Sequence, residues 1–226
     1  MMRRVETMTR IKVCGLTNLQ DARWAWQCGA DLLGFIFVPS SPRYVPPAKV
    51  AGITEALRAE GCEARFVGVF VNEPSACLKK TVQTCSLHLA QLHGDESPEY
   101  VRRLDVPVIV ARRVRERVPW EELAPYEAWA YLLDSYDPDR RGGTGHTWDW
   151  DLLQMDADVE ASKRLIVAGG LVPDNVATVV QEAQPWGVDV SSGVECRPGR
   201  KDQDKVKRFI DCVRKGDEAI CKKSER

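Results

Sequence analysis

Short apolar runs alternate with longer amphipathic stretches along almost the whole chain, and this alternation constrains the fold more than any other feature of the sequence. The runs are nearly continuous in apolar residues and rich in β-branched ones, which is typical of strands buried on both faces of a parallel sheet. Strands are expected at Ile11–Cys14, Asp31–Val38, Ala64–Val71, Leu87–Leu92, Pro107–Ala111, Trp129–Asp134, Leu165–Ala168 and Val188–Val190.

A helix is expected after each of these strands. Asn18 can cap the first helix, and Pro98 and Pro173 suit the first turn of the fourth and seventh. Strand–helix alternation implies right-handed βαβ crossovers. Eight such units favour a closed (β/α)₈ TIM barrel over an open doubly wound sheet, which usually has fewer strands. Helices are expected at Asn18–Cys28, Pro46–Ala59, Pro74–Thr84, Ser97–Leu104, Trp120–Leu123, Trp150–Met155, Pro173–Ala183 and Lys201–Lys215.

The 226 residues are expected to form a single TIM-barrel domain, residues 1–226, with its core at about 10–215, because no Gly/Ser/Pro-rich linker divides them. The residues before Thr9 and the charged tail after Asp211 are expected to be frayed ends. The longest apolar run, which ends at Val38, is too short to cross a membrane. The 8 cysteines show no CxxC spacing, so reduced thiols and a cytoplasmic protein are expected.

The charge balance bears on the partners. Lys and Arg number 32, Asp and Glu number 33, and the formal net charge is −1. Nucleic-acid binders and polybasic membrane-surface proteins usually carry a basic surplus, so neither nucleic acid nor a membrane is expected as a partner. The sequence shows no large exposed apolar stripe, so a monomer is preferred over a homodimer.

Two strand ends carry groups suited to proton transfer, because reactive groups of a barrel lie at the carboxyl ends of strands. Cys14 ends the first predicted strand near the amino end of the next helix, which can lower a thiol pKa and make Cys14 a base or nucleophile. Asp134 ends the sixth strand, where a carboxylate can act as general acid or base. A small packed residue and a loop-capping aspartate are the alternatives.

Two further side chains near this rim could hold a ligand. Arg43 is the one cation in the proline-stiffened loop after the second strand, and a guanidinium can bind a carboxylate or phosphate in a bidentate fork. His93 follows the fourth strand and faces the predicted mouth. A surface arginine and a histidine that packs within its loop are the alternatives.

Glycine-rich loops follow the last three predicted strands. Glycines let backbone N–H groups approach an anion closely, and barrels often bind phosphate in the loops after strands seven and eight. Because turns also use glycine, one such loop is weak evidence for a phosphate site, and two on consecutive units are stronger evidence. They indicate a small phosphorylated substrate. The loops are Arg141–Gly145, Ala168–Leu171 and Asp189–Val194.

No metal site is expected. Cys77, Cys85, His88 and His93 are of zinc-ligand types, but their spacing fits no structural zinc pattern, and His88 is expected inside a strand. The 7 tryptophans are scattered and offer no stacking platform for single-stranded nucleic acid.

Taken together, these motifs resemble the phosphoribosylanthranilate isomerase family, enzymes of tryptophan biosynthesis built on a small (β/α)₈ barrel. The resemblance keeps the family's order and spacing from about residue 10 to residue 212. Its segments are Ile11–Thr17, Gly34–Phe35, Ser41–Tyr44, Gly68–Asn72, Gln91–Asp95, Leu133–Asp134, Gly142–Gly145, Ala168–Leu171, Asp189–Glu195 and Pro198–Asp202.

The family's reaction is an Amadori rearrangement, which turns an aminoaldose into an aminoketose without a metal or organic cofactor. The resemblance implies that Asp134 is the general acid that opens the ribose ring and that Cys14 is the general base that removes the C2 proton. It implies that Arg43 holds the anthranilate carboxylate and that Asp189 hydrogen-bonds the substrate's amine or hydroxyls. We also expect His93 to contact the substrate. The phosphate would be held by Gly169, Gly170, Ser191, Ser192 and Gly193.

Other interpretations remain open. The related sugar isomerase of histidine synthesis uses two aspartates, one of them where this chain has Cys14. Indole-glycerol-phosphate synthase needs lysines at strand ends, whereas Lys12 lies mid-strand. A non-catalytic barrel would lack a strand-end acid or base. Trp148 stands where the family often has Phe, and the sequence decides neither the roles of Arg112 and Arg113 nor whether a second Amadori substrate is accepted.

Overall fold

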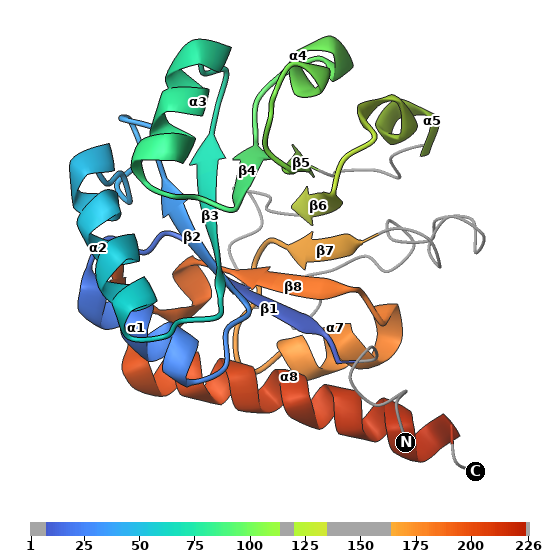
Figure 1. The fold of residues 1–226 in the computed structure, drawn as a ribbon. Coiled ribbons are helices and arrows are strands. Elements are labelled where there is room, and N and C mark those ends of the chain that lie inside the picture. Colours follow the sequence, from blue (N-terminus) through green and yellow to red (C-terminus); the bar gives the residue numbers. More distant parts are fainter. Residues whose placement is uncertain (1–7, 114–119, 135–163, 225–226) are drawn as a thin grey trace.

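Eight parallel strands close into a barrel, as predicted (Figure 1). The structure, a computed structural model, describes residues 8–113, 120–134 and 164–224. Strands pair in chain order, and β8 pairs back onto β1, which closes the barrel. The strands are β1 (Arg10–Val13), β2 (Leu32–Ile36), β3 (Arg65–Phe70), β4 (Leu89–Leu92), β5 (Val108–Arg113), β6 (Ala130–Asp134), β7 (Leu165–Ala168) and β8 (Gly187–Val190).

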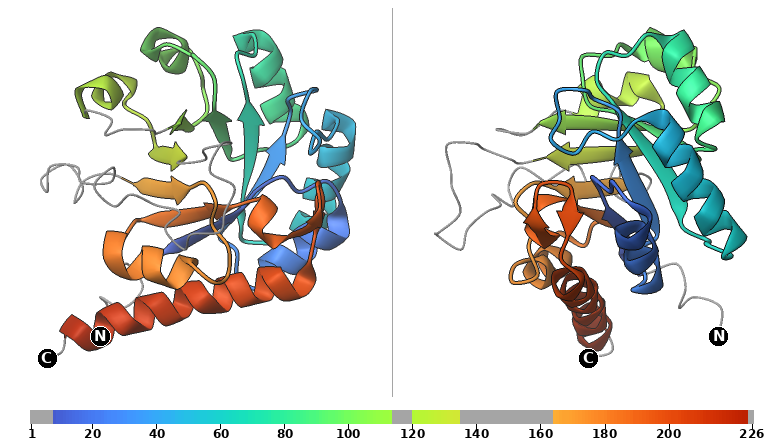
Figure 2. Two further views of the ribbon diagram at one scale, coloured as in Figure 1. Left: turned by 180° about the vertical axis from the view of Figure 1, so that it is seen from behind. Right: turned by 90° about the vertical axis from the view of Figure 1, so that its left-hand side faces the viewer.

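Helices surround the barrel on the outside (Figures 1 and 2). Asn18 caps the first one by accepting a hydrogen bond from the Asp21 backbone N–H at 2.9 Å, and Pro98 stands in the first turn of the fourth, as predicted. The predicted sixth helix, Trp150–Met155, lies outside the described residues. The helices are α1 (Leu19–Gln27), α2 (Pro47–Ala59), α3 (Ser75–Thr84), α4 (Pro98–Arg102), α5 (Trp120–Leu123), α7 (Val176–Ala183) and α8 (Gln203–Ser224).

Short elements fill two of the connections. The 3₁₀ helix η1 (Ala124–Tyr126) follows α5, and a second one, η3 (Ser192–Val194), follows β8. A two-stranded ribbon of β9 (Glu195–Arg197) and β10 (Arg200–Lys201) then leads into α8. The connection after β8 therefore has secondary structure of its own, and it begins at the rim at which β8 ends.

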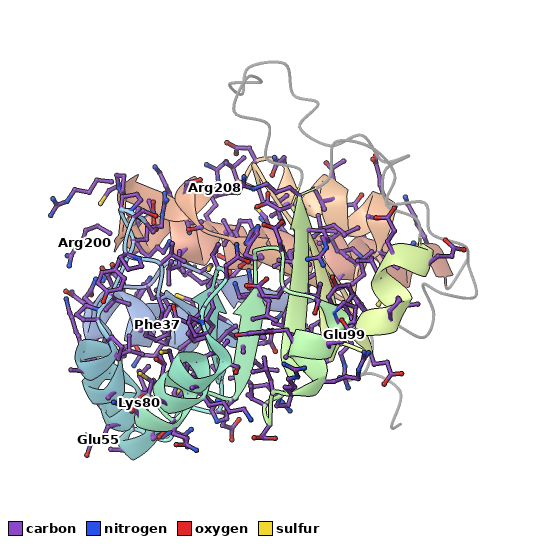
Figure 3. The ribbon with its side chains drawn as sticks, turned by 90° about the horizontal axis from the view of Figure 1, so that it is seen from above. Phe37, Glu55, Lys80, Glu99, Arg200 and Arg208 are labelled. Atoms are coloured by element: carbon purple, nitrogen blue, oxygen red, sulfur yellow. The ribbon has the colours of Figure 1, made fainter. Side chains whose placement is uncertain are left out.

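Side chains of the strands alternate between two cores, because successive residues of a strand point to opposite faces. Outward residues such as Phe35 and Leu133 pack against the helices. Inward residues fill the barrel, and they are Leu32, Val67, Leu89, Ile109, Ala111, Ala130, Leu132, Ile166 and Ala168. Figure 3 shows Phe37 inside the molecule, whereas Glu55 projects from α2 at its edge. Because all eight strands are parallel, their carboxyl ends form one rim of this packed barrel.

The chain end differs from the prediction. A helix ending at Lys215 and a frayed tail were expected, but α8 continues to Ser224. The buried Asp217 carboxylate accepts hydrogen bonds from Thr9 Oγ1 at 2.6 Å and from Arg214 Nη1 at 3.1 Å, which ties the helix to the start of β1. At Gly216 an added Cβ would lie 2.9 Å from Val180 Cβ, so the glycine lets α8 approach α7 closely. No helix in the described ranges is long and apolar enough to cross a membrane.

Candidate active site

The predicted site residues converge on one rim of the barrel. Cys14 directly follows β1, His93 directly follows β4, Asp134 ends β6, and Asp189 lies near the end of β8. Because the strands of a parallel barrel all end on the same side, these side chains lie at the carboxyl-end mouth. The sequence placed Cys14 within the first strand, but β1 ends at Val13, so Cys14 opens the loop.

A buried lysine lies directly beside Cys14. Lys12 has a side chain only 1% exposed, and its Nζ is 3.0 Å from Asp189 Oδ1. Both Lys12 Nζ and Cys14 Sγ border Gly34, where an added Cβ would lie 2.9 Å from the sulfur and 3.2 Å from the nitrogen. Glycine at position 34 therefore leaves the space that these two reactive atoms fill.

The electrostatics of this cluster correct one prediction. The amino end of the first helix, α1, was expected to lower the pKa of Cys14, but the pKa of this thiol is raised. Burial raises the pKa of the Cys14 thiol, and the positive charge of Lys12 opposes this effect. Burial also acts to lower the pKa of Lys12, but Asp189 and Cys14 outweigh it and the pKa is raised. Lys12 is therefore a cation at neutral pH.

Asp134 lies near His93 at the mouth. Asp134 Oδ2 is 3.7 Å from His93 Nε2, a separation outside hydrogen-bonding range. Burial lowers the pKa of His93 more than the neighbouring Asp134 charge raises it, so the imidazole is neutral at pH 7. Within the described part of the chain, His93 Nε2 and Gln91 Oε1 are buried atoms without a hydrogen-bond partner. Buried orphan groups of this kind are expected where a ligand supplies the partner.

Arg43 is held in place by a carboxylate that the sequence did not single out. Its Nε and Nη2 donate to Glu195 at 2.9 and 2.8 Å, a bidentate pair. Burial acts to raise the pKa of Glu195, but hydrogen bonds from Arg43 and Lys201 outweigh it and the pKa is lowered. Gly15, at φ +73°, lies against the Arg43 side chain, where an added Cβ would come 2.6 Å from Cδ. The loop that carries Cys14 therefore also supports Arg43.

The two predicted phosphate loops meet at the mouth. Gly169 and Gly170 have φ of +95° and +60°, a backbone conformation that favours glycine. An added Cβ on Gly193 would collide with the backbone carbonyl oxygen of Leu171, so the loop after β8 packs directly against the loop after β7. A phosphate site in a barrel is often built from these two loops and the amino end of a short extra helix, a place that η3 takes here.

A second buried lysine, Lys201, donates hydrogen bonds to the loop after β8. Lys201 Nζ donates to the Ser191 backbone oxygen at 3.0 Å and to Glu195 Oε1 at 2.9 Å. Ser191 Oγ is buried with no hydrogen-bond partner among the described residues. Lys201 thus joins the predicted phosphate loop to the residue that orients Arg43. The predicted loop Gly142–Gly145 and the substitution at Trp148 lie outside the described residues.

Sequence reasoning missed Lys12, Gln91, Glu195 and Lys201 as members of the site. The signals were the charged residue inside the apolar run of β1 and the acid that ends the segment Ser191–Glu195 after β8. The two arginines of the fifth strand, whose roles the sequence did not decide, have different surroundings. Arg112 stacks on the Tyr126 ring, 4.8 Å from its centroid, whereas the charge of Arg113 lies close enough to contribute to lowering the pKa of His93.

Two of the residues of zinc-ligand type, Cys85 and His88, contact backbone groups. Cys85 donates to the Pro47 carbonyl oxygen, and His88 Nδ1 accepts from the Phe66 backbone N–H at 2.8 Å. His88 was expected inside a strand, but β4 begins at Leu89. Over the described ranges, no three His, Cys, Asp or Glu side chains group as a metal site would require.

Known proteins are similar to this chain in fold and in sequence. The family profile described as N-(5'phosphoribosyl)anthranilate (PRA) isomerase matches residues 11–212. The N-(5'-phosphoribosyl)anthranilate isomerase of Citrifermentans bemidjiense is 46% identical over 203 residues, which are 90% of this chain and 96% of that protein.

Solved structures agree with this similarity. One of monomers generated from the dimeric isomerase of Thermotoga maritima has a TM-score of 0.77 at 34% identity, covering 92% of this chain and 99% of that one. Another phosphoribosyl anthranilate isomerase, in complex with reduced 1-(o-carboxyphenylamino)-1-deoxyribulose 5-phosphate, has a TM-score of 0.77 at 35% identity with the same coverage of 92% and 99%.

Proposed function

Because the chain belongs to the phosphoribosylanthranilate isomerase family, whose members carry out the isomerase step of tryptophan biosynthesis, we propose that Cys14 and Asp134 are its catalytic base and acid. The substrate would be N-(5'-phosphoribosyl)anthranilate and the product 1-(2-carboxyphenylamino)-1-deoxyribulose 5-phosphate. The observation that carries the proposal is the buried Cys14 thiol beside the Lys12 cation, at the rim where Asp134 ends β6.

The first step would open the ribose ring. Asp134 donates a proton to the ring oxygen while the C1–O bond breaks and the nitrogen lone pair forms a C1=N bond. The resulting protonated imine withdraws electrons from C2 and makes the C2–H acidic. This activation comes from the substrate itself, so the proposed chemistry requires no metal or organic cofactor.

The second step would move the proton at C2. The Cys14 thiolate takes the C2 proton, and the electron pair of the C–H bond becomes the C1=C2 bond of an enolamine while the imine electrons return to nitrogen. The enolamine then tautomerises to the ketone, as the C2 hydroxyl loses a proton and C1 gains one. The proton taken by Cys14 would return through solvent to Asp134, which restores both groups. A thiol needs only part of its population as thiolate to serve as base, which is compatible with a raised pKa.

The two ends of the substrate would be held by different chemistry. The phosphate would accept backbone N–H bonds from the glycine loops after β7 and β8, which their mutual packing supports. The residues proposed for this are Gly169, Gly170, Ser191, Ser192 and Gly193. The anthranilate carboxylate would bind Arg43, whose guanidinium is oriented by its pair with Glu195.

Two residues are proposed as further substrate contacts. His93 Nε2 is buried at the mouth, which suits a hydrogen bond to a sugar hydroxyl. Asp189 uses Oδ1 for Lys12, and its other oxygen suits the substrate's amine or hydroxyls. The preference for a monomer likewise stays a prediction, which sedimentation of the purified protein would test.

One assay tests the proposed function. Purified protein, treated with a chelator and assayed with phosphoribosylanthranilate, should form the ketose product, identified by chromatography and mass. The aminoaldose of the histidine pathway serves as the second substrate in a parallel assay. Turnover of that compound alone, or no turnover by protein with intact circular dichroism, would contradict the proposal.

A further inference from the structure

Lys12 is a buried cation to which the two proposed steps give no role. Its side chain is 1% exposed, and it lies on β1 two residues before Cys14, which opens the following loop. Lysine is almost never buried in this way without a partner, because removing an ammonium from water costs several kcal/mol. Because burying this ammonium costs free energy, we expect Lys12 to have a role within the site.

The surroundings of Lys12 supply two anionic or potentially anionic groups. Asp189 Oδ1 lies 3.0 Å from Nζ on the neighbouring strand β8, whose register places Asp189 opposite Lys12. On the other side, Nζ and the Cys14 sulfur both border the space left by Gly34, at 3.2 and 2.9 Å from where a Cβ would be. The ammonium is thus held by the Asp189 carboxylate, and the Lys12 side chain also interacts with that of Cys14.

We propose that Lys12 is a positioning residue that stabilises the thiolate of Cys14, with Asp189 holding the ammonium in place. The proposal rests on the proposed role of Cys14 as base. Lys12 stays protonated throughout the reaction, so it exchanges no proton with the substrate. Its contribution is a fixed positive charge beside the sulfur, in a buried site where charges interact far more strongly than in water.

The charges around Cys14 support this assignment. Burial, the strongest influence, raises the pKa of Cys14; Lys12 is the strongest influence that lowers it, and the more weakly acting Lys201 on β10 also lowers it. Asp189 acts in the opposite direction and raises it. His93, which also interacts with Lys12 and Asp189, is neutral at pH 7. Removing the Lys12 charge would therefore leave burial and Asp189 acting together against the thiolate.

The decisive experiment measures the thiol directly. The rate of alkylation of Cys14 by iodoacetamide would be followed between pH 7 and 11 by mass spectrometry of the Cys14 peptide, so that the other cysteines do not interfere. The thiolate is the reacting form, so the pH midpoint reports its stabilisation. In Lys12→Met the midpoint should rise by about one pH unit or more, with alkylation about tenfold slower at pH 8. Lys12→Arg should restore part of the loss.

Two controls keep the test specific. Lys201→Met removes another buried lysine and should shift the midpoint much less than Lys12→Met does. If Lys12→Met fails to fold, Lys12→Gln, which keeps a polar partner for Asp189, should show the same rise. An unchanged midpoint in folded Lys12→Met or Lys12→Gln would overturn the proposal, and so would an equal shift in Lys201→Met.

Turnover separates this proposal from the proposed function. Lys12→Met should lower kcat about tenfold or more, in step with the lost thiolate, and change KM little. If Cys14→Ser keeps full kcat, Cys14 is not the base and the proposed function fails. The alkylation midpoints would still decide whether Lys12 stabilises the thiolate.

Discussion

At the amino end of the barrel, several cations contact aromatic rings or carboxylates of the chain, whereas at the carboxyl end some buried polar atoms have no hydrogen-bond partner among the described residues. At the amino end, Arg164 stacks on the rings of Trp129 and Trp186, at 4.6 and 5.9 Å from their centroids, and Arg10 pairs with Asp31 at 2.7 Å. These residues border an open hollow of about 540 Å³ below the strands. The cations there are held by aromatic faces or by carboxylates of the same chain.

The carboxyl end is organised differently. Gln91 Oε1, His93 Nε2 and Ser191 Oγ, the buried side-chain atoms that lack a hydrogen-bond partner in the described ranges, all belong to this end. Two buried lysines, Lys12 and Lys201, also lie there. The three unpaired atoms cost stability, because a buried polar group without a hydrogen bond is unfavourable, and the phosphate, carboxylate or hydroxyl groups of the proposed substrate would supply partners for them. The amino end therefore contributes mainly to stability, and the carboxyl end carries the residues of the proposed chemistry.

The largest expected effect is at the mouth. Cys14→Ser and Asp134→Asn should each lower kcat by about 10²–10⁴, the usual contribution of an acid or base. The free energy of unfolding should change little, because both replacements keep the size of the side chain. Steady-state kinetics and urea unfolding of the same preparations would check this. Near-full kcat in either variant would remove that residue from the mechanism.

The converse effect is expected at the amino end. Trp129→Ala removes a ring that contacts Trp186 and carries Arg65 and Arg164 on its faces. The free energy of unfolding should fall by about 2–4 kcal/mol, while kcat stays within about twofold of the wild type. Urea unfolding and kinetics below the transition would show this. A large loss of kcat with an unchanged unfolding curve would break the comparison between the two ends.

Arg43→Ala tests substrate binding rather than chemistry. Loss of the proposed contact between Arg43 and the carboxylate of the substrate should raise KM by about 10- to 100-fold and leave kcat less affected. Arg43→Lys keeps the charge but not the fork, and should restore only part of the binding. An unchanged KM in Arg43→Ala would refute the carboxylate contact.

The smallest effect concerns stability and pH. The pKa of Glu195 is lowered in the folded state, so its ionisation stabilises the fold above the unfolded-state pKa, and this stabilisation is lost as the pH falls through the lowered value. The difference in Tm between wild type and Glu195→Gln should be largest near pH 7 and shrink as the pH falls below about 4.5. Calorimetry at several pH values would measure it; a difference independent of pH would show that Glu195 acts through packing alone.

The fold and the strand-end residues could be predicted because both depend on local patterns. Buried strands read as apolar runs, and Cys14 and Asp134 stand directly at the ends of two of them. The pair Lys12–Asp189 could not be predicted, because it depends on the register of β1 against β8, between residues 177 apart in sequence. The length of α8 could not be predicted either, because Asp217 on this helix accepts a hydrogen bond from Thr9, which is 208 residues away in sequence.

The partner of Arg43 shows the same limit. The sequence identified a cation in a stiff loop, but not that Glu195 fixes its orientation from a loop on the other side of β1. Nor could it show that Lys201 links Glu195 to Ser191. Contacts between distant loops are set by how the barrel closes, and no local pattern records them.

The central claim is that Asp134 opens the ring before Cys14 removes the C2 proton, and single-turnover kinetics with substrate deuterated at C2 test it most directly. The account predicts a slow reaction with a large primary isotope effect in Cys14→Ser, because C–H cleavage then limits the rate. It predicts a slow reaction with almost no isotope effect in Asp134→Asn, because ring opening then limits it. A large isotope effect in Asp134→Asn, or none in a slowed Cys14→Ser, would contradict these roles.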